Sequence, residues 1–156
     1  MDSLTIARAL HVLAIVHWIG GVSMVTLVIL PGLSRGVPAS ARLGLFEALE
    51  GRFAKQARIS TLVAGLTGLY MTYRLDAWDR FADLKFWWMD AMVAIWAIFT
   101  VMLFIAEPLF FHRVFREQAA KDPDGTFRRA ARLHIVLLTL SLITVAGAVL
   151  GAHGAL

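Results

Sequence analysis

Five histidines are the residues of this chain best suited to chemistry, and all lie in or at the ends of long apolar stretches. They are His11, His17, His112, His134 and His153. A polar, ionisable side chain inside a bilayer is rare and usually serves a function. Imidazoles that reach one level from two helices can bind the iron of a b-type haem from both faces. All five are therefore candidate metal ligands.

Four of these histidines form two pairs when their expected depths in the membrane are compared. At about 1.5 Å per residue, His11 and His153 each lie about 30 Å from the inner ends of their helices, near the outer surface. His112 and His134 fall together near the inner surface, and His17 has no partner at its own depth. The preferred haem site therefore joins His11 to His153 or another fourth-helix histidine. A second haem at His112 and His134 is the alternative.

Polar side chains close to these levels could assist a cofactor. Arg8 or Arg74 could bind a haem propionate near His11, and Tyr70 is expected at the same outer end of the bundle. Glu107, which precedes a proline, is the deepest carboxylate. It could form an ion pair with a basic residue at a kink in the helix, or it could deliver protons from the cytoplasmic side.

Small residues on three apolar stretches have two interpretations. They are Gly20, Gly21, Ser23, Ala64, Gly65, Gly68, Gly147, Ala148, Gly151 and Ala152. They could leave room for a flat macrocycle between helices. The spacing of Gly147 with Gly151, and of Ala64 with Gly68, is equally typical of close helix packing.

Copper is the competing metal, because thioether and imidazole ligands suit Cu(I). Five methionines lie in or near apolar stretches: Met24, Met71, Met89, Met92 and Met102. Single methionines in apolar helices mostly pack, however, and the sequence has no methionine cluster outside these stretches. The absence of cysteine excludes disulfides, iron–sulfur clusters and covalent haem attachment.

The elements that position these residues follow from composition. Of 156 residues, 59% are hydrophobic and 17% charged, whereas a soluble domain has about 25% charged residues. Four stretches can cross a bilayer, at about 4–30, 58–75, 87–111 and 131–152. We predict one all-α membrane domain over residues 1–156, a transmembrane four-helix bundle running up-down-up-down.

Local signals predict the helix ends and the first connection. Pro31 and Gly32 are expected to end the first helix, and residues 122–125 to form the turn between the third and fourth. Residues 43–53 combine apolar and basic positions at helical spacing. They predict either a short amphipathic helix on the inner membrane surface or a plain basic linker.

Positive charge predicts the orientation. Of the fifteen Lys and Arg residues, eleven fall in the first and third connections, and Arg8, Arg74, Arg80 and Lys85 fall at the other end. Cytoplasmic loops carry this excess, so both termini should face away from the cytoplasm of a bacterial inner membrane. Because the positive residues lie in loops between apolar segments, the net charge of +4 indicates the lipid bilayer as a partner and not nucleic acid.

The first apolar stretch resembles a known group. Residues 9–13 and 18–21, together with Phe111-His112-Arg113 and Arg132-Leu133-His134, resemble the small bacterial membrane proteins of the CopD-like and HemJ-like group. This resemblance implies a four-helix membrane unit, with b-haem and protoporphyrinogen oxidation in HemJ-like members and copper uptake in CopD-like members. It also implies that His11 is a haem ligand. The chain lacks the lysine expected inside the third helix of HemJ-like members.

Three functions remain open. The leading interpretation is a b-type haem protein of the membrane that transfers electrons or oxidises a small hydrophobic substrate, a quinol or a porphyrinogen. The first alternative is a copper-handling membrane protein. The second is a cofactor-free structural or assembly subunit, whose small-residue face would contact a homo-oligomer or a membrane-complex partner.

Overall fold

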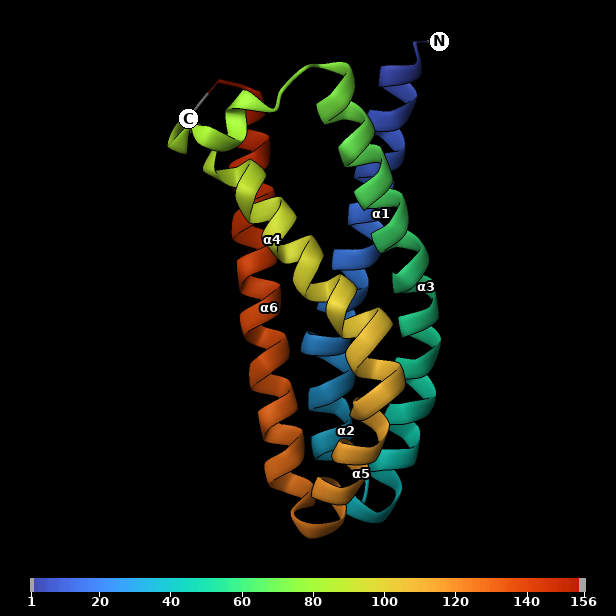
Figure 1. Ribbon diagram of the computed structural model, residues 1–156. Helices are drawn as coiled ribbons and strands as arrows, with labels where there is room; N and C mark the ends of the chain where they lie inside the picture. The colour runs from blue at the N-terminus through green and yellow to red at the C-terminus, as the bar shows by residue number, and fades with distance from the viewer. Residues whose placement is uncertain (1, 155–156) are drawn as a thin grey trace.

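The computed structural model describes residues 2–154, apart from the side chains of residues 110–112. Every regular element in this part of the chain is helical, which confirms the all-α prediction. The elements are α1 (Ser3–Met24), η1 (Val25–Ile29), α2 (Leu30–Gly36), α3 (Ala39–Arg74), η2 (Asp79–Ala82), η3 (Leu84–Phe86), α4 (Trp87–Val101), η4 (Met102–Phe111), α5 (His112–Lys121) and α6 (Pro123–Ala152). They join into four long rods: the first runs from Ser3 to Gly36, the second is α3, the third runs from Trp87 to Lys121, and the fourth is α6. The start of α1 and the end of α6 lie at the same end of the molecule (Figure 1).

Three helices in the described residues are long and apolar enough to cross a membrane: Ser3–Gly36, Leu84–Leu109 and Pro123–Ala152. They suggest a multi-pass membrane protein. The expected second span, residues 58–75, falls within α3, which is not among the three. Its apolar stretch is short because Arg58 and Arg74 bound it.

The first rod does not end where the sequence predicted. Pro31 lies in the first turn of α2, directly after the π-helical segment η1, and the chain stays helical to Gly36. Proline is tolerated there because the first N–H groups of a helix need no partner within it. The prediction that Pro31 and Gly32 end this helix is therefore wrong.

The first connection also differs from the expectation. Residues 43–53 form the lower half of the continuous helix α3, neither a separate surface helix nor an irregular linker. Phe46 explains this position, because it is fully buried against the rings of Phe115 and Phe127, with centroids 5.4 and 5.6 Å away. This aromatic cluster joins α3, α5 and α6 at the end opposite the termini.

A reversal between the last two rods is confirmed, but it is shorter than predicted: Asp122 alone separates α5 from α6, and residues 123–125 belong to the first turn of α6. Asp122 caps α6 by accepting a hydrogen bond from the backbone N–H of Gly125, and Pro123 occupies the first turn. Asp is a favoured N-cap and proline is favoured just inside a helix start. This sharp reversal holds α5 against the lower part of α6.

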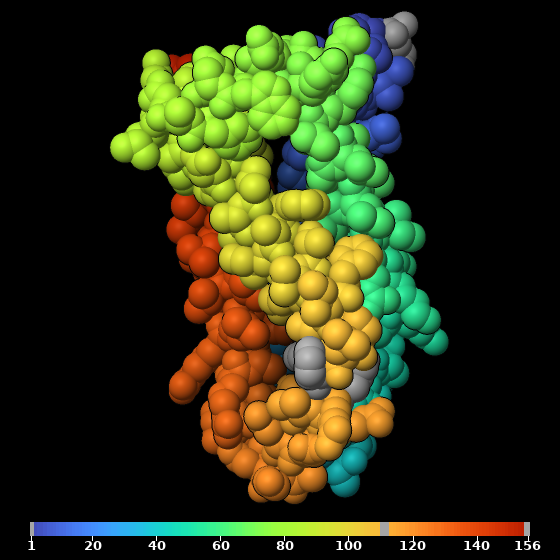
Figure 2. Space-filling view, viewed as in Figure 1, coloured from blue at the N-terminus to red at the C-terminus, as the bar shows by residue number. Residues whose placement is uncertain are grey.

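The rods form two pairs, which lie apart near the end that carries the start of α1 and the end of α6. The first rod runs along α3, and α4 runs along the upper part of α6 (Figure 1). Figure 2 shows a hollow between α3 and α4 near the end that carries the termini, with α1 visible behind it. Below this level a buried core joins all four rods through residues such as Trp18, Ala57, Phe99 and Leu137.

Candidate functional site

A cavity of about 390 Å³ lies between the rods in the half of the molecule away from the termini. Its walls come from all four rods. The lining includes Trp18, Phe53, Phe99, Met102, Glu107, Thr126, Arg129 and His134. A concave, mostly apolar space with a few convergent polar groups is the usual form of a small-molecule site.

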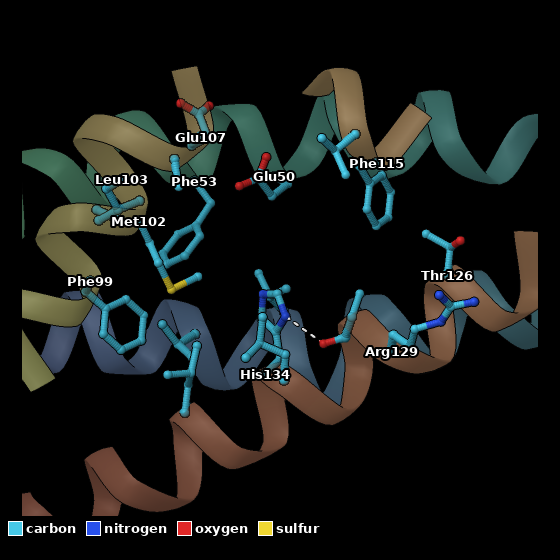
Figure 3. A pocket seen from close by; sticks show the side chains of 18 of the residues that line it. Glu50, Phe53, Phe99, Met102, Leu103, Glu107, Phe115, Thr126, Arg129 and His134 are labelled. Carbon is cyan, nitrogen blue, oxygen red and sulfur yellow. Dashed lines mark hydrogen bonds between the residues drawn. The ribbon is translucent and has the colours of Figure 1, made fainter. Parts of the chain in front are cut away.

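His134 extends from α6 into this cavity (Figure 3). Its Nδ1 lies 3.0 Å from the backbone carbonyl oxygen of Ala130, one turn earlier. A carbonyl oxygen only accepts, so Nδ1 donates and carries the ring proton. The neutral imidazole therefore keeps its lone pair on Nε2, the form in which a histidine binds a metal.

The walls around His134 are aromatic and apolar. Trp18 and Phe99 meet edge to face with ring centroids 4.9 Å apart, and Phe53 lines the cavity from α3. Figure 3 shows the thioether of Met102 extending from η4 into the same space as the His134 ring. These side chains form a surface suited to a flat hydrophobic ligand.

The other end of the cavity is polar. Thr126 and Arg129 lie at the opposite end of the view from Phe99 in Figure 3. The Arg129 guanidinium bonds the Gly125 carbonyl oxygen at 3.2 Å and the Asp122 carboxylate at 3.0 Å. Hydrogen bonding from the Gly125 N–H, assisted by Arg129, holds the pKa of the Asp122 carboxyl below its usual value. A cation is thus held in place at this end of the cavity lining.

Two buried polar atoms of the lining lack a hydrogen-bond partner among the described residues. They are the indole Nε1 of Trp18 and the hydroxyl of Thr126. Buried polar groups are nearly always paired, because an unpaired one costs about 1–3 kcal/mol. Both atoms could therefore contact a ligand in the cavity.

Glu107 completes the lining at the third rod. Its carboxylate forms an ion pair with Arg58 of α3, and the Arg58 Nε donates to the Leu103 carbonyl oxygen at 2.9 Å. The rod is π-helical over residues 102–111 and includes Pro108. This is the ion pair at a proline-disturbed helix that the sequence predicted as one interpretation of Glu107. Proton delivery by Glu107 stays a prediction.

The first-rod histidines both bond to α3. The Nδ1 of His11 lies 2.9 Å from the Ala64 carbonyl oxygen and 3.0 Å from the Thr67 hydroxyl oxygen. The Nδ1 of His17 lies 2.9 Å from the Ser60 hydroxyl oxygen, and its ring is largely exposed. The carbonyl partner leaves the Nε2 lone pair of His11 available, as at His134.

The predicted outer partner, His153, is exposed at the end of α6. Its Nδ1 bonds the Val149 carbonyl oxygen of the same helix at 2.7 Å. His11 instead faces α3, so no described contact joins these two histidines. His112 begins α5, but its side chain lies outside the described residues.

The outer polar residues have local partners. Tyr70 donates to the Ser3 hydroxyl oxygen at 2.9 Å, and the Arg74 guanidinium lies 6.0 Å from the Tyr70 ring centroid. Arg8 is exposed. Their role as propionate ligands stays a prediction.

Several small residues make room for aromatic side chains. A methyl group at Gly147 would lie 2.6 Å from the Trp87 ring, and one at Gly151 would overlap Trp88. At Gly65 it would lie 2.6 Å from the Nε1 of Trp96. Close packing therefore accounts for these glycines, in agreement with one of their two interpretations.

Comparisons with protein-family models, with curated proteins and with solved structures find no match. Sequence reasoning named His134 and Met102 but did not place them in one cavity. The signal it missed is that both lie on the inner halves of their rods, beside the aromatic residues 99 and 115.

Proposed function

We propose that this chain is a four-span protein of the bacterial inner membrane with both termini outside the cytoplasm. The three apolar helices support the multi-pass part of this proposal. Support for a fourth span comes from α3, which runs the length of the first rod and lies in contact with it. The connections at residues 36–39 and 121–123 lie together, at the end where most Lys and Arg residues occur.

We further propose that the cavity binds a b-type haem with His134 as an iron ligand. The observation that carries this proposal is the Nε2 lone pair of His134, which the Nδ1 contact to Ala130 leaves available inside an apolar space. Such sites occur in helix bundles, where ligands project inward from facing helices. When bound, haem would supply one-electron redox chemistry.

The other lining residues would hold and shield this group. Arg129 and Thr126 could bind the propionates, since a guanidinium pairs well with a carboxylate. Trp18, Phe53 and Phe99 would cover the macrocycle and exclude water. The protein would then transfer electrons, or oxidise a quinol or porphyrinogen, in the membrane.

This proposal moves the preferred haem from the outer pair to the inner cavity. The reason is that Trp87 and Trp88 fill the space at Gly147 and Gly151, and His153 is exposed. A second haem near His11 remains a separate prediction. The availability of the His11 Nε2 and the hollow between α3 and α4 favour it.

An absorption spectrum of the detergent-purified protein, with haem and copper quantified per chain, tests the function. We expect a Soret band and a dithionite-reduced α-band that His134→Ala removes or greatly reduces. His153→Ala is the matched control on the same helix and should retain them. A colourless wild-type protein, or copper without haem, would overturn the haem proposal. Haem that survives His134→Ala but is lost in His11→Ala would overturn its placement.

A further inference from the structure

Met102 occupies a distinctive place in the third rod. It is the first residue of the π-helical segment η4, directly after the last turn of α4. Its side chain is partly buried against the central core and lines the cavity. π-Helical turns inside α-helices occur frequently at functional sites. The sequence alone assigned Met102 to ordinary packing or to copper.

Besides His134, the cavity lining contains one further side chain with a ligand atom suited to haem iron. Among the lining residues that the structure describes, Met102 carries the single sulfur atom and His134 the single imidazole. They come from different rods, and both extend into the same space (Figure 3). The carboxylate of Glu107 is engaged by Arg58. A soft thioether and an imidazole are the axial pair of many electron-transfer haems.

We propose that the Sδ of Met102, together with the Nε2 of His134, would hold the haem iron as its second protein ligand. This inference rests on the proposed function, because it names a ligand within the same site. The thioether stabilises ferrous iron relative to a second imidazole, so the midpoint potential would be raised. With two protein ligands for the iron, such a centre would suit electron transfer more than oxygen activation.

The helical segment that carries Met102 is held in place by bonds to α3. Leu103 and Glu107 both bond to Arg58, which ties the π-helical segment to α3 at the turn that follows Met102. A ligand held on a braced helix keeps its position when the iron changes oxidation state.

The test compares Met102→Leu with wild type and with Met92→Leu. Leucine keeps the volume and apolar character of methionine but cannot bind iron. Met92 lies on α4 of the same rod, is partly buried and does not line the cavity, so it is the matched control. The measurements are haem per chain, the near-infrared thioether-to-iron charge-transfer band of the ferric protein, and the midpoint potential.

We expect wild type and Met92→Leu to show the charge-transfer band. Met102→Leu should still bind haem but should lack this band. Its midpoint potential should be lower than that of wild type, and its ferric spectrum should be high-spin. Met102→His should restore a low-spin spectrum of the bis-histidine type. The inference fails, and the proposed function stands, if wild type binds haem with a bis-histidine spectrum. The same holds if Met102→Leu leaves the charge-transfer band and the midpoint potential unchanged. If wild type binds no haem, the proposed function fails and this inference with it.

Discussion

Arg58 donates its Nε hydrogen to the backbone carbonyl oxygen of Leu103 across 2.9 Å. In a π-helical turn this carbonyl would accept from the N–H of residue 108, five positions later. Residue 108 is a proline and has no N–H. Arg58 of α3 thus supplies the donor that the third rod lacks, beside the cavity that we assign to haem.

Replacement of Arg58 should destabilise the protein. In Arg58→Gln the Glu107 carboxylate, 13% exposed, loses the Arg58 guanidinium and the Leu103 carbonyl loses its donor. Because the Arg58 side chain is 29% exposed, we expect a loss of about 1–3 kcal/mol, below the cost of breaking a fully buried ion pair. Chemical unfolding in detergent micelles measures the loss.

Two variants complete this test. Arg52→Gln changes an exposed residue of the same helix and should have little effect. The double variant Arg58→Gln/Glu107→Gln should recover part of the stability, because a neutral amide then replaces the Glu107 carboxylate. Equal stability of Arg58→Gln and Arg52→Gln would contradict the role given to Arg58.

The aromatic cluster at the inner end predicts a larger loss. Phe46 has no exposed surface and contacts Phe115 and Phe127. Phe46→Ala should cost about 3–5 kcal/mol, because it removes apolar contacts and leaves a cavity. The neighbouring Leu45 is 44% exposed, so Leu45→Ala should cost under about 1 kcal/mol in the same unfolding measurement. Similar losses in the two variants would show that residues 43–53 do not pack as described.

The sequence predicted the helical elements well because their signals are local. Apolar stretches and the turn signal at residues 122–125 are each read from a few neighbouring residues. The prediction failed at Pro31 because a π-helical turn before the proline lets the rod continue. It failed at residues 43–53 because their apolar side packs on α5 and α6, through contacts of Phe46 with residues 69 and 81 positions later in the sequence.

The candidate site was less predictable for a related reason. Depth along a helix can be calculated from residue number, but the direction in which a side chain points depends on rotation and tilt. His11 and His153 share a level by this arithmetic, yet His11 bonds α3 and His153 bonds its own helix. The cavity at His134 arises from the packing of four rods, which no single motif encodes.

The turn before α6 predicts a pH dependence of stability. The folded state holds the pKa of Asp122 below its usual value, so ionised Asp122 stabilises the fold. This contribution is present above the unfolded pKa, about 3.9, and is lost as the pH falls through the lower folded value. Asp122→Asn should therefore lower the thermal midpoint at neutral pH, and its difference from wild type should shrink in acid.

The control for this prediction is Asp79→Asn, which changes an exposed carboxylate in the outer connection. Its difference from wild type should be small at every pH. A constant difference between wild type and Asp122→Asn from neutral pH to below pH 3 would contradict the assigned role of the Asp122 charge.

The contact between Gly151 and Trp88 distinguishes close packing within the chain from a partner-binding face. A methyl group at Gly151 would overlap the Trp88 ring, which is 6% exposed, whereas Gly20 has no atom near its Cβ position. Gly151→Ala should therefore destabilise the protein by about 1–3 kcal/mol. Gly20→Ala should be neutral or stabilise by up to about 1 kcal/mol, since alanine favours a helix. If Gly151→Ala instead keeps full stability and dissociates an oligomer in size-exclusion chromatography, the small-residue stripe is an assembly surface.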